Sequence, residues 1–252
     1  MNKLVLRTVV PLILLILWWV TPAGSTSPFW PPLPDILAAF RETWLFERAG
    51  SDIVPSLARL LAGLVCAVVT GIGLGAAMGR LPLLDAALAP LIRFCRAVPG
   101  PALVPVAVVL LGIGDTSKIA VIAFVSIFPV LLNTVDAVRG LDPHWDDVAR
   151  SYRLSTRQRV TAVYLPAAAP QIAVGIRTGL GIAFIMIVIT ELYAATNGVG
   201  FVTLTARNAF DVPQMWAGTV LLGLLGVALN GLFLILERRV LRRHLAMTTE
   251  RN

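Results

Sequence analysis

Few residues of this chain have the types and spacing that chemistry at a site requires. Its two cysteines, Cys66 and Cys95, fit no zinc or redox motif, and its two histidines and 14 acidic residues form no cluster along the sequence. There is also no GxxxxGKS or GxxxxGKT loop of the kind that cradles ATP phosphates. The sequence therefore predicts no catalytic residue, no metal site and no nucleotide held by this chain.

Two charged residues, Arg177 and Glu191, lie inside a long apolar stretch at 170–193. A charge inside a membrane is costly, so each could line a solute pathway or pair with a buried partner. Each also lies near an end of the stretch, from where a long side chain can reach the lipid headgroups. Both alternatives remain open for the two residues.

Glycines recur at four-residue spacing in two apolar stretches. They are Gly71, Gly75 and Gly79 in one stretch and Gly175 and Gly179 in another. Small residues at this spacing allow helices to approach closely, whereas a dinucleotide-binding fingerprint needs a preceding strand and a following acidic residue. We therefore predict that these glycines serve helix packing.

The composition indicates a membrane protein. Of the 252 residues, 57% are hydrophobic and only 14% are charged, compared with about a quarter charged in soluble domains. A spanning helix needs about 20 apolar residues, and the sequence predicts one all-α domain over 1–252 with six such helices. The expected spans are 4–22, 60–78, 97–113, 119–135, 170–193 and 215–236.

The third expected span, 97–113, is interrupted by proline. It contains Pro99, Pro101 and Pro105, and we expect it to pack inside protein, where neighbours can satisfy the freed carbonyl groups. The preceding stretch, 83–92, is apolar but is too short to cross a membrane.

The positive charges predict the orientation. With both termini on the cytoplasmic side, most of the 21 Lys and Arg residues, Arg93 and Arg96 included, fall on that side. This distribution explains the net charge of +7 without nucleic-acid binding. The stretch 4–22 could alternatively be a cleaved signal peptide, but Trp18 and Trp19 favour a span with an interfacial anchor.

The expected cytoplasmic loop, 140–166, has the signals of two short helices joined by a turn. Asp142 and Pro143 are expected to open the first helix as its cap and first residue. Ser155 and Gln158 form a capping box for the second helix, which is expected to end at the Leu-Pro pair that closes the loop.

The first helix of this loop is amphipathic. Its apolar face comprises Trp145, Val148, Ala149 and Tyr152, and its charged face comprises Asp146, Asp147 and Arg150. The apolar face could pack on the chain's own spans or dock a partner protein, and periodicity alone leaves both alternatives open.

The loop resembles the signature of permease subunits of binding-protein-dependent ABC importers, which reads E-A-A, three residues, G, nine residues, I, one residue, L-P. The corresponding positions here are Asp147, Val148, Ala149, Arg153, Val163, Leu165 and Pro166. Three further stretches, SLARLLAGLVCAVVTGIGLGAAMGR from Ser56, LLGIGDTSKIA from Leu110 and ELYAATNGVGF from Glu191, resemble the nitrate, sulfonate, taurine and bicarbonate group of these permeases. Arg153 departs from the signature's glycine, and a left-handed backbone there would cost an arginine about 1–2 kcal/mol.

The resemblance implies the fold of a type I ABC importer permease and a chain that does not itself hydrolyse ATP. In such importers two permeases pair, here as an expected homodimer, and two ATPase subunits that hold ATP and Mg bind the cytoplasmic loops. An external solute-binding protein delivers the solute, and lipid of a bacterial inner membrane surrounds the permeases. The ATPase-coupling residues that the resemblance implies are Trp145, Asp146, Asp147, Val148, Ala149, Arg150, Tyr152, Arg153, Leu154, Ser155, Leu165 and Pro166.

The expected function is therefore the passage of a small, anionic solute, such as a sulfonate, taurine or nitrate, driven by a partner's ATP hydrolysis. Besides Arg177 and Glu191, the turn signal Asn197–Gly198 in an expected loop at 194–214 is a candidate outer gate or contact for the delivering protein. The alternatives are a different small solute, export, or a secondary transporter, which needs acidic residues at mid-membrane. A membrane-embedded enzyme would instead need clustered His, Asp or Cys.

Overall fold

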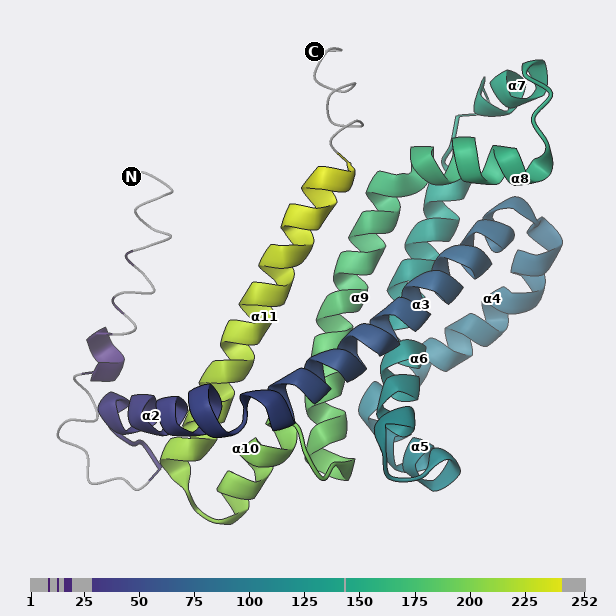
Figure 1. The fold of residues 1–252 in the computed structure, drawn as a ribbon. Coiled ribbons are helices and arrows are strands. Elements are labelled where there is room, and N and C mark those ends of the chain that lie inside the picture. The colour runs from purple at the N-terminus through teal and green to yellow at the C-terminus, as the bar shows by residue number, and fades with distance from the viewer. Residues whose placement is uncertain (1–8, 10–12, 14–15, 20–28, 143, 242–252) are drawn as a thin grey trace. The chain divides into compact units, whose positions relative to one another are not determined.

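The computed structural model describes residues 9, 13, 16–19, 29–142 and 144–241. Throughout that part of the chain the regular structure is helical, without a strand (Figure 1). The helices are α2 (Leu33–Phe40), η2 (Arg41–Glu47), η3 (Ala49–Ile53), α3 (Val54–Arg80), α4 (Pro82–Ala97), η4 (Gly100–Ala102), α5 (Leu103–Leu111), α6 (Asp115–Arg139), α7 (His144–Ser151), α8 (Thr156–Gln158), η5 (Arg159–Tyr164), α9 (Leu165–Ala194), α10 (Val199–Asn208) and α11 (Val212–Val240).

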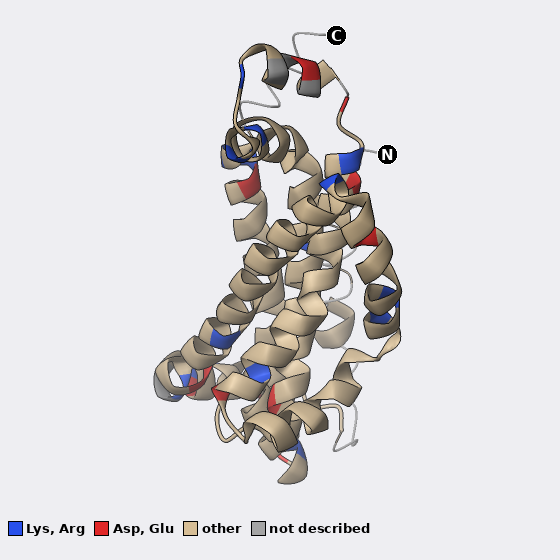
Figure 2. Cartoon of the chain, turned by 90° about the vertical axis from the view of Figure 1, so that its right-hand side faces the viewer, with Lys and Arg blue, Asp and Glu red and all other residues tan. Residues whose placement is uncertain are grey.

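Four of these helical runs are long and apolar enough to cross a membrane, or five if one bent pair counts as a span. They contain α3, α6, α9 and α11, and the expected spans 60–78, 119–135, 170–193 and 215–236 lie within them. The 27 residues of α3 correspond to a length of about 40 Å, more than the hydrocarbon core requires. Figure 2 shows most of the ribbon in tan, because charged residues are sparse on these helices. The first expected span, 4–22, lies mostly outside the described residues.

The expected span 97–113 is not a single straight helix. Helix α4, which includes the stretch 83–92, and the run Gly100–Leu111 form the bent pair, with an angle of 84° between them. The break falls at Val98 and Pro99, both of which have extended backbone, and Pro101 follows in η4. Proline disfavours the helical conformation in the residue before it, which explains why the helix ends here. The expected packing inside protein holds for one face of α5 only, because Val104 is buried whereas Val109 is exposed.

The described chain divides into two compact units, and the larger, which we call the core unit, comprises Ser56–Ala195 and Leu225–Asn252. Its centre is α6, which α3 and α9 both contact (Figure 1). The predicted packing glycines lie at these contacts. A Cβ added to Gly75 of α3 would lie 2.7 Å from the carbonyl oxygen of Leu131, and one added to Gly175 of α9 would lie 2.8 Å from that of Pro129. Gly71, Gly79 and Gly179 likewise face α6.

The second unit, which we call the N-terminal unit, comprises Met1–Pro55 and Thr196–Leu224. Helix α10 lies within the expected loop 194–214, so this stretch is not an irregular loop. Gly198 precedes α10 with a φ of 116°, a conformation that glycine adopts without steric cost. Its backbone N–H donates a 2.7 Å hydrogen bond to Oδ1 of Asp52, whose side chain is buried. This bond joins the start of α10 to η3.

Candidate functional site

The 140–166 loop is ordered by local hydrogen bonds at the start of each of its short helices. Oδ1 of Asp142 accepts a 2.9 Å hydrogen bond from the backbone N–H of His144, as expected for a cap. At Ser155 both bonds of the predicted capping box are present, with Gln158 as the reciprocal partner. Pro143 and the side chains of Asp146, Val148 and Arg150 lie outside the described residues.

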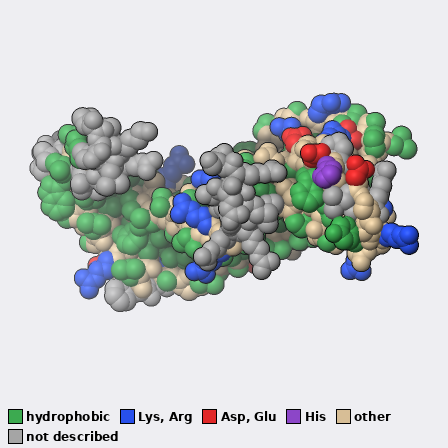
Figure 3. Space-filling view, turned by 90° about the horizontal axis from the view of Figure 1, so that it is seen from above, with side chains coloured by type: hydrophobic (Ala, Val, Ile, Leu, Met, Phe, Trp, Pro, Cys, Tyr) green, Lys and Arg blue, Asp and Glu red, His purple; other side chains and the backbone are tan. Residues whose placement is uncertain are grey.

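The predicted apolar face of α7 is divided between the protein interior and the surface. Ala149 is fully buried, whereas Trp145 is 44% exposed and Tyr152 is 76% exposed. Figure 3 shows hydrophobic side chains beside acidic and basic ones over this end of the molecule. The buried Ala149 agrees with packing on the chain itself, whereas the two exposed aromatic residues are available to a partner protein.

The turn between α7 and α8 retains a left-handed residue although the glycine of the signature is replaced. Arg153 has a φ of 50°, and the backbone N–H of Leu154 donates a 3.0 Å hydrogen bond to the carbonyl oxygen of Ala149. A bond across five residues with a left-handed residue before its donor is typical of a Schellman helix end. Arg153 therefore adopts a left-handed backbone conformation that glycine adopts easily but that is sterically unfavourable for a residue with a Cβ.

The second helix of the loop does not end at Leu165 and Pro166. Instead, α8, η5 and α9 form one helical run from Thr156 to Ala194, which turns near its start (Figure 1). Pro166 is the second residue of α9, and the preceding wide turns of η5 accommodate the change in direction. The prediction of a break there was therefore wrong.

Arg80 connects this run to the end of α3. Its guanidinium carbon lies 3.5 Å from the ring centroid of Tyr164 in η5, and the Tyr164 side chain is buried. A desolvated cation–π contact of this kind contributes about 1–2 kcal/mol. In addition, Nε of Arg159 donates a 2.9 Å hydrogen bond to the carbonyl oxygen of Leu154. The Arg80–Tyr164 contact therefore joins the 140–166 loop to α3, and the Arg159–Leu154 bond stabilises the loop internally.

Glu191, a predicted pathway residue, lies in a buried ion-pair cluster near the other end of α9. Its Oε1 accepts hydrogen bonds from Oγ of Ser56 at 2.7 Å and from Nη1 of Arg59 at 3.0 Å. Nε of Arg59 also donates a 2.7 Å hydrogen bond to Oδ1 of Asp115, a side chain that is 63% exposed. Glu191 and Arg59 are both almost fully buried, so each relies on the other for charge compensation, and Arg59 is in addition paired with Asp115.

The cluster joins α3, α6 and α9 at one end, which is the outer end if the termini are cytoplasmic. It supplies the buried partner that the sequence left open for Glu191. Arg177, by contrast, is exposed and lies near the middle of α9, further from a helix end than the apolar stretch suggested. Asn197 and Gly198 belong to the N-terminal unit, described separately above.

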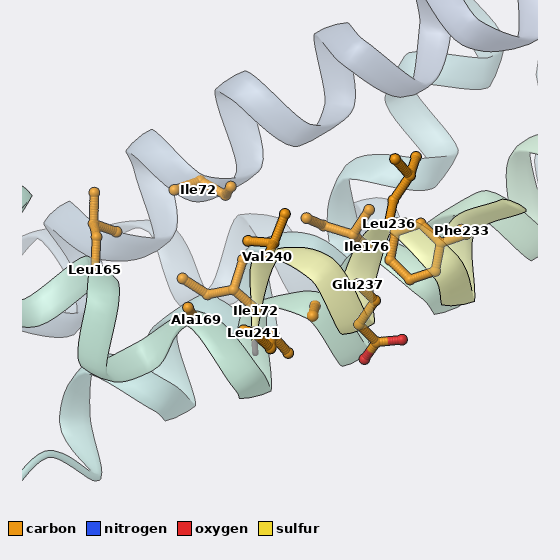
Figure 4. Close-up of a pocket in the computed structure, with 11 residues that line it drawn as sticks. Ile72, Leu165, Ala169, Ile172, Ile176, Phe233, Leu236, Glu237, Val240 and Leu241 are labelled. Atoms are coloured by element: carbon orange, nitrogen blue, oxygen red, sulfur yellow. The ribbon is translucent and has the colours of Figure 1, made fainter. Parts of the chain in front are cut away.

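A cavity of about 340 Å³ between α3, α9 and α11 offers little chemistry for a polar solute. Its lining is apolar except at Glu237, whose carboxylate points away from Leu236 and Ile176 (Figure 4). Small-molecule sites combine apolar walls with a few convergent polar groups. This cavity therefore does not qualify as a site for an anion.

Sequence reasoning missed the roles of Arg59, Arg80 and Asp52. Arg59 was visible as a charge at the edge of a span, which is a signal for a buried partner. The contact of Asp52 with Gly198, 146 positions away, has no local signal at all.

Comparison with known proteins gives consistent matches over most of the chain. Residues 67–242 match the family described as binding-protein-dependent transport system inner membrane component. The chain is 34% identical over 239 residues to the taurine transport system permease protein of Escherichia coli (strain K12), covering 92% of this chain and 87% of that protein. It is 30% identical over 234 residues to the putative aliphatic sulfonates transport permease protein of Bacillus subtilis (strain 168), covering 92% and 85%. A solved chain of the MetNI methionine ABC transporter has a similar fold, with a TM-score of 0.61 at 16% identity over 75% of this chain and 94% of that chain.

Proposed function

The chain belongs to the family of binding-protein-dependent transport system inner membrane components, and we propose from this premise that it forms half of the passage of an ATP-driven importer. Its cargo in this proposal is a small anionic solute. Because relatives are named for taurine and for aliphatic sulfonates, a sulfonate is the cargo that we propose. The passage is completed by a second copy of the chain within the lipid of a bacterial inner membrane, with both termini in the cytoplasm.

The observation that carries the proposed coupling is the exposure of two large aromatic residues, one on α7 and one directly after it. Trp145 of α7 and Tyr152, the residue after its end, remain at the surface, while Ala149 of α7 is fully buried. A short amphipathic helix of this kind suits an apolar groove on another protein, and aromatic residues dominate the binding energy of such contacts. The proposed partner in this groove is an ATPase subunit, which holds the ATP and Mg.

The contacts behind α7 support transmission of movement into the spans. The second half of the 140–166 loop is continuous with α9 in one helix from Thr156 to Ala194 and contacts α3 through Arg80 and Tyr164, and α7 joins it through the hydrogen-bonded turn at Arg153. ATP binding can favour one access state only if the partner contacts differ between states. In our proposal the surface of α7 supplies those differing contacts.

Copurification with the cognate ATPase subunit tests the proposal. The double variant Trp145→Asp, Tyr152→Asp should lower the amount of ATPase recovered by about tenfold or more, because it places two charges in an apolar contact. Tyr193→Asp is the matched control, since Tyr193 is similarly exposed, at 74%, but lies near the opposite end of α9.

Full recovery of the ATPase with the double variant would contradict the docking proposal. Uptake by the purified chain without any ATPase would instead support a secondary transporter. If Tyr193→Asp loses ATPase binding to the same extent, general unfolding is the cause. Gel filtration in detergent therefore checks that each variant is folded before the comparison.

A further inference from the structure

A second cavity of the core unit is lined by a positively charged residue, which the described lining of the apolar cavity lacks. Its volume is about 280 Å³, and it lies where α4, α6 and α9 meet. Arg96 and Cys95 line it from the end of α4, Phe124 and Phe128 from α6, and Thr178 from α9. Arg96 is the charged residue among the described lining residues, none of which is acidic.

The cavity lies at mid-length of the long helices. Phe124 and Phe128 are near the middle of α6, Asp115–Arg139, and Thr178 is near the middle of α9, Leu165–Ala194. Arg96 therefore does not belong with the cytoplasmic charges among which its sequence position placed it. An ionisable residue at this depth in a membrane protein marks a solute or ion pathway by default.

The break between α4 and η4 adds a second, independent indication. Val98, where the backbone leaves the helix, also lines the cavity. Irregular backbone at membrane depth is tolerated where it is buried in protein or borders a water-filled cavity, and interrupted helices form the solute sites of many transporters. The bend of 84° thus has a ready explanation in a cavity that receives a polar solute.

We infer that this cavity is a binding site for an alkanesulfonate on its way through the membrane, an inference that rests on the proposed function. The planar guanidinium of Arg96 suits the sulfonate oxygens, which it can bind in a bidentate manner. Phe124 and Phe128, whose ring centroids are 5.4 Å apart, form an apolar wall for the alkyl group. The hydroxyl of Thr178 donates to the carbonyl oxygen of Val174, so the attraction for the anion comes from Arg96.

Cys95 provides a test that does not depend on transport. In the assembled transporter with Cys66→Ser, Cys95 is the permease's remaining thiol, and its rate of modification is measured with two methanethiosulfonates of similar size. One carries a sulfonatoethyl group and the other a trimethylammonioethyl group. Arg96→Gln should lower the ratio of the anionic to the cationic rate by roughly tenfold, because it removes the local positive charge. Taking the ratio cancels any change in the reactivity of the thiol itself.

Arg93→Gln is the matched control, because Arg93 lies one turn earlier on α4 and does not line the cavity. It should leave the ratio near that of the parent, and Arg96→Lys should retain most of the ratio by keeping the charge. Ethanesulfonate should slow modification of Cys95 in the parent, and nitrate should do so less well because it has no alkyl group to place against Phe124.

An unchanged ratio in Arg96→Gln, or equal protection by nitrate and ethanesulfonate, would overturn the inference. ATP-driven uptake of ethanesulfonate, measured with the same assembled transporter in lipid vesicles, distinguishes failure of one proposal from failure of the other. If the labelling pattern is as expected but no uptake occurs, the importer proposal fails and the anion site stands. If uptake is normal in the parent and in Arg96→Gln, the importer proposal stands and the site fails.

Discussion

Replacing Arg153 by glycine should strengthen the turn between α7 and α8. Arg153 has a φ of 50°, and a left-handed backbone costs a residue with a Cβ about 1–2 kcal/mol. Glycine avoids this cost but loses about 0.5–1 kcal/mol through its greater freedom in the unfolded chain. The net gain expected for Arg153→Gly is therefore about 0.5–1 kcal/mol in the local free energy of opening.

Hydrogen exchange at the backbone N–H of Leu154 measures this gain directly. That group donates to the carbonyl oxygen of Ala149 across the turn, and exchange there should slow roughly two- to fivefold in Arg153→Gly. Arg153→Ala keeps the Cβ and should show no slowing. Phe210→Gly changes the other non-glycine residue with positive φ among the described residues and should slow exchange at Asp211 but not at Leu154. Unchanged or faster exchange at Leu154 in Arg153→Gly would refute the reasoning.

Two further substitutions test the packing and the charges of the core unit, both measured as thermal stability of the purified protein in detergent. Gly75→Ala should destabilise the protein by about 1–3 kcal/mol, because the added Cβ would meet the carbonyl oxygen of Leu131 at 2.7 Å. Gly73→Ala, with open space around it, should be neutral or slightly stabilising. Equal effects of the two substitutions would contradict a close contact of α3 with α6. Glu191→Leu should destabilise by about 1–3 kcal/mol, because Arg59 loses its buried carboxylate partner and keeps the more exposed Asp115, and the double variant Glu191→Leu, Arg59→Met should recover much of the loss. A double variant no more stable than the single one would argue against the ion pair as the cause.

The sequence predicted best those features that depend on neighbouring residues. The all-helical membrane fold was predicted correctly, because uninterrupted apolar runs such as that of α3 have few alternatives in lipid. The capping box of Ser155 and Gln158 was also predicted, since both partners lie within one helical turn. For Arg153 the sequence left open whether the left-handed turn survives, and the structure retains it.

Features that depend on three-dimensional contact were missed. The stretch 83–92 was predicted only to be too short to cross a membrane, whereas it is part of α4 and of one arm of the bent pair. The side chain of Asp85 pairs with Arg139 at 2.7 Å, a contact across 54 positions that no local pattern reveals. The Leu-Pro pair at 165–166 predicted a helix end, because proline usually stops a helix. The wide turns of η5, which precede the pair and allow the helix to continue, have no recognisable pattern in the sequence.

The unbroken course of η5 into α9 makes this part of the chain a lever. The 30 residues of α9 rise about 1.5 Å each, so a tilt of about 5° at the Tyr164 end displaces the far end by roughly 4 Å. That displacement exceeds the 3.0 Å separation between Arg59 and Glu191, so the ion pair must either part or carry α3 along with it. A tilt of α9 at the Tyr164 end, where Arg80 contacts the ring, would therefore change the Arg59–Glu191 contact near the other end of the helix.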